Sequence, residues 1–321
     1  MSVAQAADED LAAREPDEPP LKLAFVGQGV YFRQCALEHS AGGIEPAFVD
    51  FRAAASAGLL LSRLHEVDPD VVLVFRPEIV PADLFRELRA VTIGYLTEPL
   101  PRSGGMLHPD LEQRMWWLEQ VDASNFDRIL SFDPLIAETA GGVLPVWRSL
   151  PLPVADALFM GVREWARPPR MLFVGRSTSH REELLAPLKA RHPIVHVGHG
   201  LFGDALIRFL RRADIQLNLH NNPYPSFENR VCAALAAGHL VISEPLSPTH
   251  QLAAGVEYLE VATPEQLLAL VERIVDDPQS FVDVQHAGRR AAERFRASSV
   301  YPALVRDALA DISERGSARR G

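Results

Sequence analysis

The chain has 321 residues, of which 47% are hydrophobic and 23% charged, and its mean hydropathy is near zero. This length and composition are typical of a globular protein with two α/β domains or one large one, and they exclude a mainly disordered chain. The formal net charge of −10 repels nucleic acid and acidic membranes, so we expect no nucleic acid partner, although a local basic site can still bind a phosphate.

The two cysteines, Cys35 and Cys232, are far apart and flanked by small or apolar residues. This pattern predicts buried thiols and neither a disulfide framework nor a zinc site. No stretch approaches 18 uninterrupted apolar residues, so we expect no transmembrane segment. The acidic start differs from a signal peptide, and the cytoplasm is therefore the expected location.

Residues 1–20 are rich in Ala, Asp, Glu and Pro, which predicts a disordered tail. From residue 21 to 150, short apolar runs alternate with amphipathic segments, a rhythm that indicates a parallel sheet covered on both faces. The expected strands are Leu21–Val26, Pro46–Phe51, Val71–Phe75, Val91–Leu96, Arg128–Phe132 and Leu144–Arg148. The expected helices include Leu59–His65, Pro81–Arg89 and Leu111–Gln120.

A proline-rich stretch over residues 151–169 interrupts this rhythm, which then starts again. The expected strands of the second half are Arg170–Val174, Ile194–Val197, Ile215–Leu219, Leu240–Ile242 and Tyr258–Val261. The expected helices are Arg181–Ala190, Asp204–Arg212, Phe227–Ala237, Pro264–Asp276 and a segment from Phe281 to about Phe295. We therefore predict two Rossmann-like domains, 21–150 and 170–300, joined by a linker over 151–169 and followed by a C-terminal helix and tail over 301–321. The alternative is a single long doubly wound sheet.

Ligands of open α/β sheets bind at the carboxyl ends of the strands, and the turn from Gly175 to Arg181 follows such an end. Glycine lets a ligand approach the backbone, and the start of the next helix offers free N–H groups. Arg176 and Arg181 are five residues apart and can converge on one phosphate group. The alternative is a solvated turn with two surface arginines.

A second polar group follows the strand that ends near Leu219, and it continues into the next expected helix. Glu228 and Asn229 suit the first turn of a helix that Ser226 caps, so capping alone explains part of this pattern. The residues predicted to line a ligand pocket here are Asn218, His220, Asn221, Glu228, Asn229 and Arg230.

In the N-terminal half, Gly27-Gln28-Gly29 follows the first strand, but without the rest of the fingerprint it is weak evidence for a dinucleotide site. With two domains, this turn would face the cleft as part of an acceptor site. Acidic residues also follow later strands, and Glu98 or Asp133 is the predicted catalytic residue that approaches the acceptor as a general base. In the C-terminal half, His192, His196 and His199 flank an expected strand, but no Cys or carboxylate joins them at the spacing of metal ligands. We therefore expect no metal site.

Four segments of the C-terminal half together resemble the GT-B glycosyltransferases, in particular the spore-maturation-protein-like group. They are Leu150-Pro151-Leu152-Pro153 through Phe159, Phe173-Val174-Gly175 through Arg181, Ala213–Leu219 and Arg230–Gly238. The resemblance covers residues 150–300 and implies a GT-B architecture, with two Rossmann-like domains and a cleft between them. It also implies transfer of a hexosyl group from a nucleoside diphosphate sugar to a glycan, protein or small-molecule acceptor, with no metal or other cofactor.

In related retaining enzymes, a basic pair five residues apart holds the donor diphosphate, and Arg176 and Arg181 match that spacing. The family normally has a glutamate five residues before the glycine of the last motif, where it holds the ribose hydroxyls. Ala233 stands there instead, which puts catalytic competence in doubt. The alternatives are therefore a non-catalytic binder of sugar nucleotides or glycans, and a GT-B sugar-nucleotide epimerase.

Overall fold

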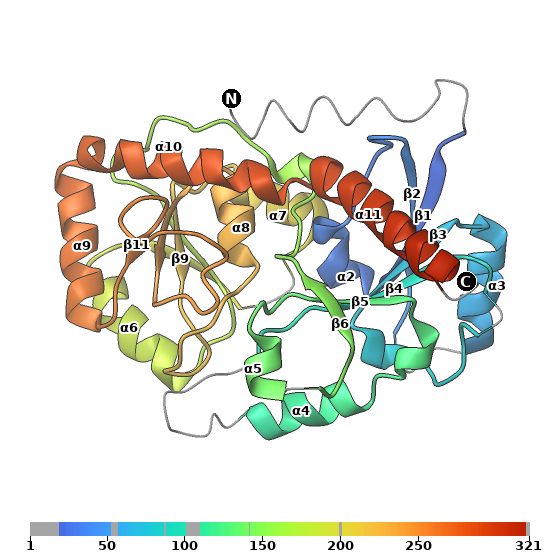
Figure 1. Ribbon diagram of the computed structural model, residues 1–321. Helices are drawn as coiled ribbons and strands as arrows, with labels where there is room; N and C mark the ends of the chain where they lie inside the picture. Colours follow the sequence, from blue (N-terminus) through green and yellow to red (C-terminus); the bar gives the residue numbers. More distant parts are fainter. Residues whose placement is uncertain are drawn as a thin grey trace.

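The computed structural model describes residues 19–52, 57–86, 88–100, 110–140, 142–198 and 201–318. Nearly all of the predicted N-terminal tail lies outside these residues. Two parallel sheets lie side by side, one built from each half of the chain (Figure 1). The prediction of an α/β protein with two Rossmann-like sheets is confirmed, and the alternative of one long sheet is wrong.

The N-terminal sheet has the strand order β2-β1-β3-β4-β5-β6, and all of its pairings are parallel. Its strands are β1 Leu21–Gly27, β2 Ile44–Asp50, β3 Val71–Phe75, β4 Val91–Leu96, β5 Arg128–Ser131 and β6 Val146–Ser149. Every side chain of β3 is buried, as its unbroken apolar run predicts for a central parallel strand. The helices of this half are α2 Gly29–Phe32, α3 Ala57–Val67, α4 Leu111–Glu119 and α5 Ile136–Ala140.

The C-terminal sheet has the order β11-β10-β9-β7-β8 and is also parallel. Its strands are β7 Met171–Val174, β8 Ile194–Val197, β9 Ile215–Asn218, β10 Leu240–Ser243 and β11 Leu259–Glu260. The helices are α6 Ser179–Lys189, α7 Gly203–Leu210, α8 Arg230–Ala236, α9 Pro264–Asp276 and α10 Val282–Ala291. The Thr178 and Thr263 side chains cap α6 and α9 by accepting backbone N–H groups.

Alternate side chains along each buried strand point to opposite faces of the sheet and so enter different cores. In β1, Phe25 faces one core and Val26 the other, and in β7 Leu172 and Phe173 are divided in the same way. The core that contains Phe25 and Leu172 is one continuous apolar cluster shared by both halves of the chain. The halves are therefore packed together and not merely tethered.

The last helix, α11 (Ala297–Ala318), leaves the C-terminal half and crosses onto the N-terminal sheet (Figure 1). Tyr301 is fully buried there, and its hydroxyl donates to the backbone oxygen of Cys35. On the same helix, Asp311 accepts from Arg128 at 2.6 Å. The helix reaches Ala318, so most of the segment predicted as a C-terminal helix and tail over 301–321 is helical.

Two predicted helices differ from the structure for local reasons. Residues 81–86 form successive turns, because Asp83 has a left-handed backbone with φ of 57°. Asn125 replaces the missing helical bonds by accepting from the Phe85 N–H and donating to the Pro81 oxygen. Helix α8 begins at Arg230 and not at Phe227, because Ser226 instead pairs with Leu246 in a short parallel bridge.

Replacing Gly288 by alanine should destabilise the protein, although alanine is normally the better helix former by about 1 kcal/mol. A Cβ at this position in α10 would lie 2.5 Å from the Glu257 backbone oxygen and 2.7 Å from Leu235 Cδ2 in α8. Overpacking of this kind costs about 1–3 kcal/mol and should outweigh the propensity gain.

Urea denaturation of Gly288→Ala measures the outcome. Gly161→Ala is the matched control, because nothing lies within 4 Å of its added Cβ. A Gly288→Ala protein as stable as the control would show that α10 can move away from α8 at little cost.

Candidate active site

The polar residues of the C-terminal half gather where β7, β9 and β10 end. Because neighbouring strands are parallel, their carboxyl ends lie at one edge of the sheet. This edge faces the N-terminal half: Asn222, after β9, donates to Asp110 at 3.2 Å, and Phe132 packs against Phe227 with ring centroids 5.6 Å apart. The carboxyl edge of the C-terminal sheet therefore borders an interdomain cleft.

Arg181 is the most constrained cation of this edge. Its side chain is almost fully buried, with Nε donating to the Leu219 oxygen and Nη1 to the Arg176 oxygen, both at 3.0 Å. Burial lowers the pKa of Arg181 to about 10, and the neighbouring positive charge of Arg230 adds to this shift. Even so, the guanidinium stays protonated at neutral pH, so the fold holds a fixed positive charge here.

Gly175 leaves the room that Arg181 occupies, since a Cβ on Gly175 would lie 3.2 Å from Arg181 Nη1. Arg176 behaves differently from Arg181. Its side chain is exposed, and its Nε donates to Asn221 Oδ1 at 3.2 Å. The predicted pair thus consists of one buried arginine and one exposed arginine on the same turn.

Arg230 and Glu228 complete the charge cluster. Arg230 donates to the Val174 oxygen at 3.2 Å, and its Nη2 lies 3.2 Å from Glu228 Oε2. Burial raises the pKa of Glu228, but Arg230 and Arg181 together hold it below its usual range. Glu228 is therefore a carboxylate between two cations, and the cluster keeps a net positive charge with Arg176 included.

Asn218 and His220, both predicted as pocket residues, are buried beneath this edge. Asn218 Nδ2 donates to Ser243 at 2.8 Å, and His220 Nε2 lies 2.8 Å from the Pro245 oxygen. Burial lowers the pKa of His220, against the opposing effect of Glu244. These two bonds tie the end of β9 to the end of β10 and the residues that follow it. Both side chains are buried, whereas Arg176 is exposed.

The sequence prediction missed Glu244 and His180. Glu244 is 5% exposed, and its carboxylate lies 2.6 Å from both His180 Nε2 and the His220 N–H. It follows β10 directly, so the rule that located Asn218 at the end of β9 applies equally to it. His180 comes from the first turn of α6, and only the fold brings it to β10.

On the opposite wall, Glu98 follows β4 and opens toward the cleft, with 64% of its side chain exposed. The pKa of Glu98 is raised, with partial desolvation as the main cause. Arg114, 3.7 Å from Glu98, opposes the shift, while the charge of Glu228 across the cleft adds to it. A carboxyl group with a raised pKa in a cleft has the properties of a general base.

Asp133 does not fit the predicted catalytic role. It has no exposed surface, and its two carboxylate oxygens accept the backbone N–H groups of Leu100 and Leu135, both at 2.9 Å. Its carboxylate organises the two loops that follow β4 and β5. Sequence position alone does not distinguish it from Glu98, because both acids follow adjacent strands.

Two hollows lie between the halves, and Arg230 of the charge cluster lines the first of them. One, of about 100 Å³, is lined by Ala233, Asn229, Arg230 and, from the N-terminal half, Gln34. The Asn229 Oδ1 atom is buried there without a hydrogen-bond partner among the described residues. The wall at Ala233 thus carries the Asn229 amide and no carboxylate.

The second hollow, of about 310 Å³, is lined by Gly29 and Asp50 on one side and by α7 on the other. Asp50 Oδ1 accepts the Gly29 N–H at 3.3 Å, which orders the turn after β1. The Gly27-Gln28-Gly29 turn therefore faces the cleft as predicted. The Gly29 N–H of this turn is already hydrogen-bonded to the Asp50 carboxylate.

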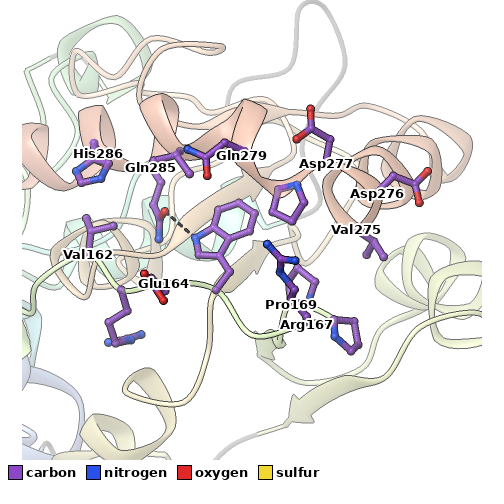
Figure 2. Close-up of a pocket in the computed structure, with 15 residues that line it drawn as sticks. Val162, Glu164, Arg167, Pro169, Val275, Asp276, Asp277, Gln279, Gln285 and His286 are labelled. Carbon is purple, nitrogen blue, oxygen red and sulfur yellow. Dashed lines mark hydrogen bonds between the residues drawn. The ribbon is translucent and has the colours of Figure 1, made fainter.

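A larger hollow of about 780 Å³ lies elsewhere, between the linker and the α9–α10 corner (Figure 2). Trp165 lines it, and its indole N–H donates to Gln285 at 2.7 Å. The linker reaches β7 at its N-terminal end, so this hollow is at the edge of the sheet opposite the arginines. It takes no part in the charge cluster.

Two Rossmann-like parallel sheets that face each other across a cleft define the GT-B fold. Residues 170–310 match the sequence family described as glycosyl transferase-like. The C-terminal half is thus similar in sequence to this family, and the arrangement of the two sheets is that of the GT-B fold. Assignment to the spore-maturation-protein-like group stays a prediction. No curated protein sequence matches the chain significantly.

Solved structures with similar folds include the Anabaena protein HepE in complex with UDP and glucose, with a TM-score of 0.60 and 11% identity over 91% of this chain and 100% of that one. Sucrose-phosphate synthase from Thermosynechococcus elongatus has a TM-score of 0.59 and 12% identity over the same shares. AviGT4, a glycosyltransferase involved in avilamycin A biosynthesis, has a TM-score of 0.57 and 13% identity over 90% of this chain and 97% of that one. At these identities the similarity establishes the fold alone.

No helix among the described residues is both long and apolar enough to cross a bilayer. No three His, Cys, Asp or Glu side chains among them are grouped so that they could hold a metal ion.

Acidification should weaken the contact between the halves through His250. Its ring packs against Phe132 and Phe227, with centroids 4.5 and 4.7 Å away. Burial lowers the pKa of His250 to about 4, while Asp133 opposes this shift and Arg294 adds to it. Because the unfolded chain binds this proton with a pKa of about 6.5, the free energy of unfolding should be highest above that pH and fall as the pH drops toward 4.

Urea unfolding at about pH 7.5 and pH 5 measures this loss, which we expect to be roughly 1–3 kcal/mol from His250. His250→Gln should reduce the difference between the two pH values without abolishing it, because the pKa of the buried His239 is also lowered to about 4. An unchanged difference in the variant would exclude His250 as the cause.

Proposed function

We propose that the protein is a glycosyltransferase that moves a sugar from a nucleoside diphosphate sugar to an acceptor held against the N-terminal half. The observation that carries this proposal is the set of three arginines, Arg176, Arg181 and Arg230, at the carboxyl edge of the second sheet. The similar folds solved with UDP and with UDP-glucose support uridine nucleotides as the first donors to test.

In this proposal the arginines bind the donor diphosphate. When the bond between the sugar carbon and the phosphate oxygen breaks, negative charge accumulates on the departing diphosphate, and fixed guanidinium groups stabilise it. Arg181 is held in place by its backbone contacts, so it requires no reorganisation during the reaction. Exposed Arg176 can close over the ligand. The arginines would supply this charge without a metal ion.

Glu98 would act on the acceptor. The acceptor hydroxyl attacks the sugar carbon as its proton passes to the Glu98 carboxylate, and the electron pair of the broken bond leaves with the diphosphate. The raised pKa of Glu98 brings it closer to neutrality, where proton transfer is efficient. The side chain must be ionised to accept the proton, so turnover should fall on acidification.

Removing the predicted arginine pair should abolish donor binding. A hydrogen bond to a charged group contributes about 1.5–3 kcal/mol, so Arg176→Ala should weaken UDP binding by roughly 10- to 100-fold, and Arg176→Ala/Arg181→Ala further still. Calorimetry with UDP and other nucleoside diphosphates measures both variants, with thermal unfolding as the check on folding.

Arg191→Ala is the matched control, since Arg191 is an exposed arginine paired with Glu272 on α9. Because Arg181 is buried, its replacement also lowers stability, so the single Arg176 variant isolates the effect on binding. A folded double variant that binds every nucleotide as tightly as wild type would refute the diphosphate site.

Replacing Glu98 by glutamine should lower turnover by about 10²- to 10⁴-fold while leaving nucleotide affinity nearly unchanged. The amide keeps the size of the side chain but accepts no proton. Product formation from a donor and a panel of acceptors measures turnover. Glu119→Gln, at the exposed end of α4, is the control, and equal turnover in both variants would remove Glu98 from the mechanism.

A second candidate is a non-catalytic binder of sugar nucleotides, which Ala233 favours. The hollow beside Ala233 offers an amide where a carboxylate would accept two ribose hydroxyls. Nucleotide binding without transfer to any acceptor, and without conversion of the donor alone, would favour this candidate. Conversion of the donor alone would instead indicate an epimerase.

A further inference from the structure

Helix α7 carries an exposed surface that the proposed reaction does not use. We call it the α7 surface and define it by Phe202, Arg208, Phe209, Arg211 and Arg212. Phe202 is 47% exposed and Phe209 is 37% exposed, and all three arginines are exposed as well. Large apolar side chains beside cations distinguish this surface from an ordinary solvated helix face.

The three arginines lie within five residues, and none forms an ion pair with a described residue. Asp204, one turn before Arg208, is the single acidic residue from Phe202 to Arg212. The segment therefore carries a local positive charge in a chain whose formal net charge is −10. A positive region of this kind attracts an anionic partner that the rest of the molecule repels.

The helix geometry gathers these side chains on one side. Leu206 and Leu210 face the core, and Arg208 lies on the opposite side of α7. Arg211 is the C-cap residue of α7, and the Arg212 N–H donates to the Phe209 oxygen, so both arginines and exposed Phe209 lie close together at the end of the helix. The aromatic ring and the two cations can therefore meet one flat partner together.

The neighbouring edge strand extends the apolar part of this surface. In the sheet register Val195 pairs with Leu172, and Leu172 belongs to the core that Leu206 and Leu210 enter. Paired residues point to the same face of a sheet, so Val195 lies on the side that α7 covers. Val195 is 48% exposed at the edge strand β8.

The same helix borders the hollow between the two halves. Phe202, Leu206 and Ile207 line the cavity of about 310 Å³ whose opposite wall contains Val30 and Arg33. A partner bound at the α7 surface is therefore next to the mouth of the cleft.

We propose that the α7 surface docks the protein on an anionic lipid bilayer. Arginines attract acidic headgroups, while Phe202 and Phe209 gain by entering the boundary between headgroups and acyl chains. A nucleic acid would bind the arginines, but it offers no apolar region comparable to acyl chains in which Val195 could be buried. The apolar side chains thus favour a membrane surface over another polyanion.

This inference does not depend on the proposed glycosyl transfer, because docking requires neither donor nor acceptor. The experiment is sedimentation of the full chain with vesicles made of equal parts phosphatidylglycerol and phosphatidylcholine, compared with pure phosphatidylcholine vesicles. We expect binding to the anionic vesicles alone, weakening as salt is added.

Two variants separate the contributions of charge and apolar contact. Arg208→Gln/Arg211→Gln/Arg212→Gln should weaken binding at least tenfold, since each arginine near an acidic membrane is worth about fivefold in affinity. Phe202→Ser/Phe209→Ser should weaken binding to the same vesicles without changing the net charge. All five side chains are exposed, so both variants should fold, and thermal unfolding checks this.

The matched charge control is Arg290→Gln/Arg294→Gln/Arg306→Gln, three exposed arginines that do not belong to the α7 surface. Val256→Ser, at a side chain 53% exposed, is the apolar control. Both controls should keep wild-type vesicle binding. Absence of binding by the wild type, or equal loss in the charge control and the α7 variant, would overturn the proposal. Tight binding of a single-stranded oligonucleotide with no effect of the phenylalanine changes would overturn it in favour of a nucleic acid partner.

Discussion

The structure depends on one apolar cluster that both halves of the chain share. It joins one face of the N-terminal sheet, the linker, α8 and α11, and it places the carboxyl edges of the two sheets opposite each other. The Tyr301 hydroxyl of α11 donates to the Cys35 oxygen in the segment after β1, so the C-terminal helix is attached to the first elements of the N-terminal half. Because this packing is continuous, the cleft is a property of the whole fold and not of either sheet alone.

Within the cleft, charge is divided unevenly between the walls. The C-terminal wall has three arginines around one acid, Glu228, and an internal scaffold in which Glu244 organises His180 and His220. Burial makes these charges costly unless they are paired, and the fold satisfies Arg181 with backbone oxygens instead of a second carboxylate. The guanidinium therefore keeps an excess positive charge that an anionic ligand can neutralise.

The α7 surface and the cleft are neighbouring features with different chemistry. In the cleft, Arg181 and Arg230 are held by backbone oxygens at the ends of buried strands, whereas the exposed arginines of the α7 surface form no ion pair among the described residues. The first arrangement suits a small anion held in a defined position, and the second suits an extended anionic surface. Their proximity would place the mouth of the cleft beside the docked surface.

The sequence by itself determined the two parallel sheets, because unbroken apolar runs such as Val71–Phe75 and Val91–Leu96 have few other stable arrangements. It also located the Arg176–Arg181 turn, since strand, glycine and helix cap are all local signals. Only the tertiary structure decided which of Glu98 and Asp133 opens toward the cleft, because both follow adjacent strands and differ only in what surrounds them. It alone brought His180 to Glu244 and placed α11 on the first sheet, because these contacts join segments whose spacing along the chain carries no local signal.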